Sequence, residues 1–132
     1  MCTTLVALLL LSFGCAKRIE LVPDRDRPLP QGTISRIEKH NGITRYELKV
    51  TNLLPPSELD SEANLYIVWE SSQDGRIVKK VAQLGAIKGS KKFTVETSLT
   101  DVRFYVTAEL APDVNSPTGP VAIKEFSRPA TN

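Results

Sequence analysis

The chain has few of the residues that usually carry chemistry. Its 132 residues include only two cysteines, Cys2 and Cys15, and one histidine, His40. The residues after Cys15 therefore lack the thiols that a disulfide framework or a thiolate metal site requires. A single histidine also excludes a metal site built on a pair of imidazole ligands. We accordingly expect no cofactor.

Neither sign of charge dominates the sequence. Seventeen basic residues stand against 15 acidic ones, which gives a net charge of +2. This balance argues against a nucleic-acid-binding protein, because such proteins usually carry a concentrated basic face. The hydrophobic fraction of 41% is typical of a folded globular domain, and the length suffices for one domain with its own core.

A short apolar run near the N-terminus ends abruptly in small residues. Residues 5–16 carry no charge, but a membrane-spanning helix needs about 20 apolar residues. A signal peptide needs a core of only roughly 7–15, followed by small residues. The run ends in Gly14, Cys15 and Ala16, and the stretch LLSFGC resembles a bacterial lipobox. In such signals the cysteine receives a diacylglycerol, and the chain is cleaved just before it.

This resemblance implies a signal peptide over residues 1–14 and a lipidated Cys15 at the start of the mature protein. Two or more acyl chains hold a protein stably at a membrane. Ala16 is not the aspartate that retains such lipoproteins at the inner membrane, so the outer membrane is favoured. Ser12 and Phe13 depart from the usual lipobox residues. An uncleaved anchor, another type of signal peptide and a buried core segment therefore stay open.

Residues 15–31 are expected to form a linker. Pro23, Pro28 and Pro30 exclude a helix and a central strand. The charges of residues 24–27 alternate in sign and keep the segment solvated, as in a semi-rigid linker. The folded domain is expected over residues 32–132.

Alternation of apolar and polar residues dominates the rest of the chain. Tyr46, Leu48 and Val50 share one face of a strand whose other face is charged. Residues 64–71 are apolar on both faces, as in a central strand. The pattern predicts seven strands, over residues 32–39, 43–52, 64–71, 76–87, 91–98, 102–111 and 120–126.

Turn signals separate these strands. Asn41-Gly42 and Asp74-Gly75 are expected in type I′ hairpin turns. Residues 53–63 form a long connection with one helical turn near residues 57–62. Seven short strands at this spacing predict an all-β fold, a seven-stranded Ig-like β-sandwich or a small barrel.

Two stretches resemble the extracytoplasmic domain of anti-sigma-K-type factors. They are LLPPSELDSEANLYIVWESSQDGRI, which starts at Leu53, and VRFYVTAELAPDVNSPTGPVAI, which starts at Val102. The segment Ser-Pro-Thr-Gly-Pro at 116–120 is the most specific part. The resemblance implies a β-sandwich in the cell envelope. It does not imply sigma-factor inhibition, because the sigma-binding helical domain and membrane helix of those factors have no counterpart in this sequence.

Candidate sites are few. Glu58, Asp60 and Glu62 are spaced by two in one loop, which suits either a calcium site or a solvated acidic loop. Trp69 is expected as the core tryptophan of the sandwich. No Gly-x-Ser-x-Gly nucleophile elbow occurs, and His40 lies beside a turn.

We therefore expect a non-enzymatic lipoprotein that faces the periplasm or the cell surface. It would bind the membrane through the lipid on Cys15 and serve as a protein-interaction module or accessory subunit in an envelope complex. The alternative is a ligand-binding or sensing lipoprotein that takes calcium or a glycan at the loops 53–63 or 111–120.

Overall fold

The computed structural model describes residues 29–129, which are nearly all strand. The predicted signal peptide, the predicted lipidation site Cys15 and most of the predicted linker lie outside the described residues. None of the helices within 29–129 has the length and apolar character of a membrane span. The elements are β1 (Gln31–His40), β2 (Ile43–Leu53), the 3₁₀ helix η1 (Pro56–Glu58), β3 (Leu65–Ser71), β4 (Val78–Gly85), β5 (Gly89–Thr97), β6 (Arg103–Glu109), β7 (Val121–Ile123) and β8 (Phe126–Ser127).

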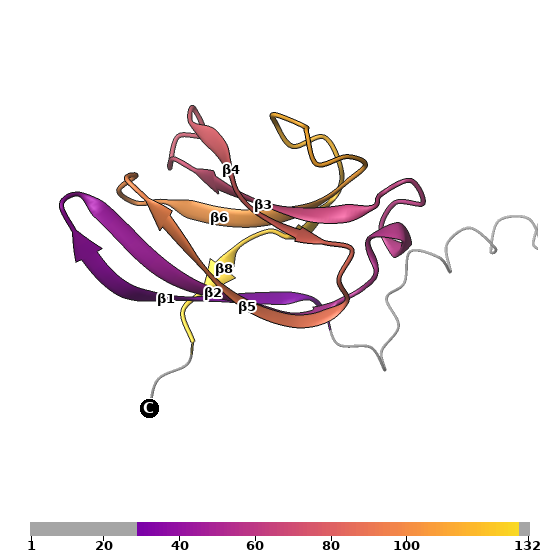
Figure 1. Ribbon diagram of the computed structural model, residues 1–132, viewed down its shortest axis with the longest axis horizontal. Coiled ribbons are helices and arrows are strands. Elements are labelled where there is room, and N and C mark those ends of the chain that lie inside the picture. The colour runs from indigo at the N-terminus through magenta and orange to yellow at the C-terminus, as the bar shows by residue number, and fades with distance from the viewer. Residues whose placement is uncertain (1–28, 130–132) are drawn as a thin grey trace, which may run out of the picture.

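Two four-stranded sheets lie face to face (Figure 1). Sheet A has the order β5-β2-β1-β8, and sheet B has the order β4-β3-β6-β7. Neighbouring strands are antiparallel, except that β8 runs parallel to β1. The predicted all-β, sandwich-like fold is confirmed, and β3 is a central strand, as its two apolar faces indicated.

The end of the chain differs from the prediction, because eight strands take the place of seven. The single strand expected over residues 120–126 is two short strands that join different sheets. Ile123 of β7 pairs with Val106 in sheet B, whereas Phe126 of β8 pairs with Gly32 in sheet A. A period of two describes each strand but does not say which sheet the strand joins.

The main core lies between the two sheets. It takes alternate residues from the inner face of each sheet, and its fully buried members include Leu48 and Val50 from β2 and Tyr66 and Val68 from β3. The rings of Tyr46 and Phe104 meet edge to face across the layers, with centroids 5.6 Å apart.

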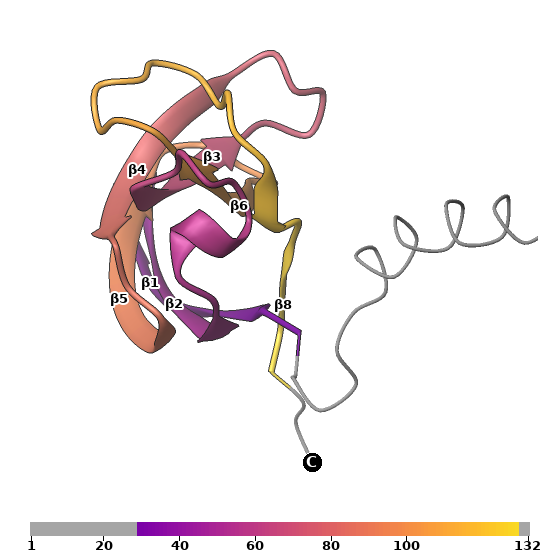
Figure 2. The same ribbon diagram turned by 90° about the vertical axis from the view of Figure 1, so that its right-hand side faces the viewer.

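A second apolar cluster covers the other face of sheet B. Leu65, Ile67 and Trp69 are buried there, and Tyr105 and Val114 pack against them. Val114 belongs to the loop 111–120, which lies on the side of sheet B away from sheet A (Figures 1 and 2). Trp69 is fully buried, but it is not in the core between the sheets, where the sequence analysis placed it. Its strand is buried on both faces, so alternation alone cannot say which face meets the other sheet.

Candidate functional site

The three carboxylates of the predicted ligand loop lie exposed around η1. The Asp60 Oδ1 atom accepts a hydrogen bond from the Glu62 backbone N–H at 3.0 Å, which closes a local turn. Within residues 29–129, no three His, Cys, Asp or Glu side chains are gathered so that they could hold a metal ion. The fold therefore does not assemble Glu58, Asp60 and Glu62 into a calcium site.

The connection 53–63 is held to the core by a tyrosine. The Tyr66 hydroxyl donates a hydrogen bond to the Leu54 carbonyl oxygen at 2.5 Å. Burial, and to a smaller extent the negative charge of Glu58, raise the pKa of Tyr66 to about 12. Tyr66 therefore stays neutral and keeps its donor proton throughout the physiological range.

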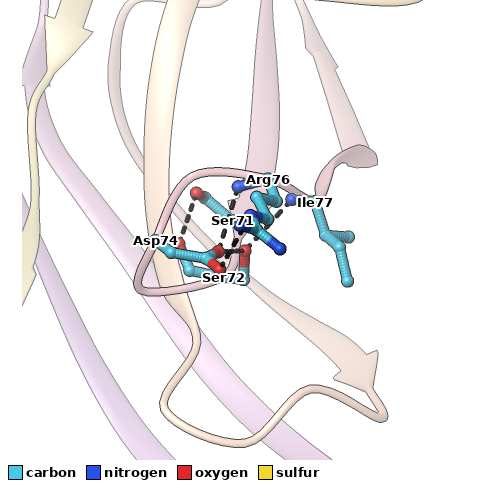
Figure 3. Close-up of polar contacts among 5 residues, drawn as sticks. All are labelled: Ser71, Ser72, Asp74, Arg76 and Ile77. Carbon is cyan, nitrogen blue, oxygen red and sulfur yellow. Dashed lines mark hydrogen bonds and ion pairs between the residues drawn. The ribbon is translucent and has the colours of Figure 1, made fainter.

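The connection between β3 and β4 is held mainly by hydrogen bonds within the loop (Figure 3), and the Gln73 side chain ties it to the Asp101 carbonyl oxygen at 2.8 Å. The Ser72 Oγ donates to Asp74 Oδ1 at 2.7 Å, and the same oxygen accepts from the Arg76 N–H at 3.1 Å. These hydrogen bonds lower the pKa of Asp74, with the Ser72 hydroxyl as the largest cause. Gly75 has φ +76°, but Asp74 does not share a positive φ. The type I′ turn predicted here is therefore wrong, whereas Asn41 (φ 52°) and Gly42 (φ 81°) both have the positive values that such a turn requires.

A buried glutamate organises the loop over sheet B. Glu109 is only 1% exposed, and its carboxylate accepts hydrogen bonds from the Thr107 hydroxyl at 2.5 Å and the Thr118 hydroxyl at 2.5 Å. The backbone N–H groups of Thr118 and Gly119 both donate to it at 3.1 Å. Thr107 in turn accepts the indole N–H of Trp69 at 2.8 Å. We call this network of Trp69, Thr107, Glu109, Thr118 and Gly119 the Glu109 latch.

The Glu109 latch explains why the loop has its particular sequence. Burial alone would raise the pKa of Glu109, but the hydrogen bonds from Thr107, Thr118 and Gly119 outweigh it and hold this pKa below its ordinary value. A Cβ on residue 119 would lie 1.8 Å from the Ala108 carbonyl oxygen, so only glycine fits there. The Pro-Thr-Gly segment is thus a structural element that closes the loop.

Alternation in β6 does not identify Glu109 as a structural residue. Glu109 lies on the face opposite Val106 and Ala108, where a glutamate of an antiparallel sheet is ordinarily solvated. The signal that was available is a glutamate at the end of a strand followed nine residues later by Thr-Gly, whose hydroxyl and N–H groups can surround a carboxylate.

A groove of about 1170 Å³ lies at one side of the sandwich in the described part of the protein. One wall comes from the β1–β2 hairpin, which contributes Lys39, Gly42 and Thr44. The loop 98–102 and the end of the described chain, residues 125–129, form its other walls. Its apolar and aromatic lining consists mainly of Ile34, Tyr46, Phe104 and Phe126.

The charged lining of this groove is mostly basic. It contains four basic and two acidic side chains: Arg36, Lys39, Arg103, Arg128, Asp101 and Glu125. His40, the single histidine, is exposed at the tip of the same hairpin and is not part of the lining. The groove offers apolar contact and positive charge, which suits the binding of a partner that carries apolar groups and negative charge.

Comparison with protein-family models, curated proteins and solved structures gives no match for this chain.

Proposed function

We propose that the protein is a lipid-anchored, non-enzymatic binding module of the bacterial cell envelope. In this proposal Cys15 carries the acyl chains, the linker up to residue 31 spaces the domain from the membrane, and the sandwich contacts a protein partner. The segment 1–14 is then the cleaved signal peptide.

The observation that carries the proposal is the groove. It combines an apolar and aromatic floor with a basic rim, and it lies beside strand edges, which are common sites of protein contact. The other polar cluster, the Glu109 latch, stabilises the loop 111–120 through its buried contacts and is not part of the groove. The lipobox-like stretch that ends at Cys15 supports the membrane location.

We further propose that the sandwich is of the Ig-like type. The strand orders fit a Greek-key arrangement. One sheet contains β5-β2-β1, and the other contains β4-β3-β6-β7 with β3 and β6 in its middle. The parallel addition of β8 to β1 extends the first sheet. This assignment agrees with the resemblance to the extracytoplasmic domain of anti-sigma-K-type factors.

The membrane part of the proposal is tested by intact mass spectrometry of the full chain isolated from native membranes. We expect a mass that lacks residues 1–14 and includes acyl chains. The Cys15→Ser variant should keep residues 1–14, carry no acyl chains and leave the lipoprotein fraction, whereas the matched Cys2→Ser variant should behave as the wild type. An unmodified wild-type Cys15 would contradict the anchor.

The partner is tested by chemical cross-linking in the same membranes, followed by denaturing purification. We expect a cross-linked species that contains the protein and one specific partner. Recovery of the monomer alone, at cross-linker levels that capture a known envelope complex, would contradict the binding role.

A further inference from the structure

We propose that the groove binds an extended, net-acidic segment of a partner protein as an additional strand beside β1. This inference rests on the proposed function and names the chemistry of the partner. It follows from the open strand edges, the space next to them and the charge around them.

The edge of β1 is only partly covered within residues 29–129. β8 pairs with Gly32 and Thr33, and no described strand lies beyond them on that side. The Gly32 carbonyl oxygen faces β8, because it accepts a hydrogen bond from the Ser127 hydroxyl at 3.5 Å. Since backbone groups along a strand point alternately to either side, those of Ile34 and Arg36 face the open edge.

The edge of β6 is open on the same side of the sandwich. β7 pairs only with Val106 and Thr107, so residues 103–105 pair with β3 on one side and have no described strand on their other side. β7 and β8 are joined by two residues, Lys124 and Glu125, and each pairs with only two residues of its neighbour. The groove borders the residues of β1 and β6 that follow and precede these pairings. It is lined by residues of β1, β6 and β8, as expected for a place where one more strand would complete a sheet.

A bulge limits how far such pairing can extend. The register of β1 against β2 shifts between Arg36 and Glu38. Bulges and charged residues are common on edge strands, where they prevent uncontrolled pairing with other chains. We therefore expect a short ladder over residues 34–36, with side-chain contacts supplying the rest of the affinity.

The charge of the groove selects the occupant. Its four basic side chains exceed its two acidic ones, which leaves a net charge of +2. An acidic segment would be attracted to Arg36, Lys39 and Arg103, and an apolar side chain between its acids would fit against Ile34 and Tyr46, which are partly exposed. A second copy of β1 suits the groove less well, because β1 itself brings Arg36 and Lys39 against only one acid, Glu38.

The test begins with a phage-displayed library of random peptides, selected on the full chain in detergent micelles. We expect enriched peptides to be net acidic and to bind in fluorescence anisotropy with an affinity that falls as salt rises. In hydrogen exchange, the bound peptide should slow the Ile34 and Arg36 amides and leave the Lys49 amide unchanged.

Paired variants then separate the charge from the backbone contact. Arg36→Ala removes one charge and should weaken binding about fivefold. Arg36→Pro also removes the edge-facing N–H, and we expect a further loss of about fivefold. Arg103→Glu reverses a charge on the opposite wall and should abolish binding. Arg45→Ala, on the outer face of sheet A, is the matched control and should leave the affinity unchanged.

Several results would overturn this inference: no enriched peptide, enriched peptides without excess acid, or binding that Arg36→Pro and Arg103→Glu leave intact while both variants melt as folded proteins. A dimer that dissociates in Arg36→Pro would assign the edge to a second copy instead. If a partner is cross-linked in membranes but these variants retain it, the proposed function stands and the groove is not its site. If Cys15 is unmodified and no partner is captured, the proposed function fails whatever the peptides do.

Discussion

The outer faces of the two sheets differ in their exposure to solvent. On sheet A, the outer face carries charged residues such as Arg45, which forms ion pairs with Glu38 and Glu96 at 3.0 Å each. On sheet B, the corresponding face carries Ile67 and Trp69, and it is covered by the loop 111–120. One sheet therefore has a single buried face, and the other has two.

This difference shows that a loop can act as a third layer. The Glu109 latch fixes one end of the loop 111–120, and the Lys80 ammonium donates a hydrogen bond to the Pro112 carbonyl near the other end. Val114 packs on the apolar cluster between these two points. The loop thus buries a face that would otherwise expose a large apolar patch.

The largest effect is expected for the loss of the Trp69 side chain. Trp69→Ala deletes a fully buried ring under the loop, and we expect it to destabilise the protein by about 3–5 kcal/mol. Urea denaturation monitored by circular dichroism measures this loss. Trp69→Phe keeps most of the volume and should cost less. A loss below about 1 kcal/mol for the alanine variant would mean that this cluster adds little to stability.

The next largest effect is expected for the carboxylate of the Glu109 latch. Glu109→Gln replaces an acceptor-only group with an amide that presents hydrogens to the Thr118 and Gly119 donors, and we expect a loss of about 2–3 kcal/mol at neutral pH. Glu47→Gln makes the same chemical change on the outer face of sheet A and should be nearly neutral. Equal losses for the two variants would contradict the role of the latch.

Glu109 also predicts a pH dependence. Its pKa is lower in the folded protein than its ordinary value of 4.5, so its contribution to stability is fully present above that value. This contribution is lost as the pH falls below 4.5 and passes through the folded pKa. Thermal denaturation from pH 7 to 3 should therefore show a steeper loss in the wild type than in Glu109→Gln. Parallel profiles would contradict the assignment.

A smaller effect is expected where the connection 53–63 is tied to the core. Tyr66→Phe removes the hydroxyl that donates to the Leu54 carbonyl, and the expected loss is about 1 kcal/mol. Hydrogen exchange should become faster in the connection around Leu59 while the β6 amides are unaffected. A uniform change across the whole sandwich would instead indicate a general loss of core packing.

The smallest effect is expected on the exposed face of sheet A. Arg45→Ala breaks both surface ion pairs, yet we expect a loss of less than about 1 kcal/mol, because exposed pairs gain little in water. Adding salt to the wild type should reduce this difference further. A loss comparable to that of Glu109→Gln would remove the contrast between the two faces.

Local features of the fold were predictable where short-range chemistry decides them. Asn41-Gly42 predicted its turn because few other residue pairs tolerate two positive φ values. The alternation in β2 predicted the buried Leu48 and Val50. The loop between Ser72 and Ile77 was predicted wrongly, because its side-chain hydrogen bonds give the backbone an alternative to the two-residue turn.

The candidate sites were harder to predict, because each depends on residues that are distant in sequence. The groove combines Ile34, Phe104 and Phe126, which come from three separate strands. The latch needs Glu109 to be buried, and nothing in the alternation of β6 says that a loop will cover its outer face. The acidic loop is the opposite case. The spacing of Glu58, Asp60 and Glu62 suggested a calcium site, but within residues 29–129 the fold brings no three such side chains together.

The strand-forming pattern and the Asn41-Gly42 turn could be read from the sequence, since they depend on backbone conformation and on the period of two. The tertiary structure alone decided that the last predicted strand divides between the sheets, that Trp69 is buried under a loop instead of between the layers, and that Glu109 is surrounded by donors. The physical reason is that burial depends on which distant segment covers a face. Alternation defines two faces of a strand but does not identify what lies against either of them.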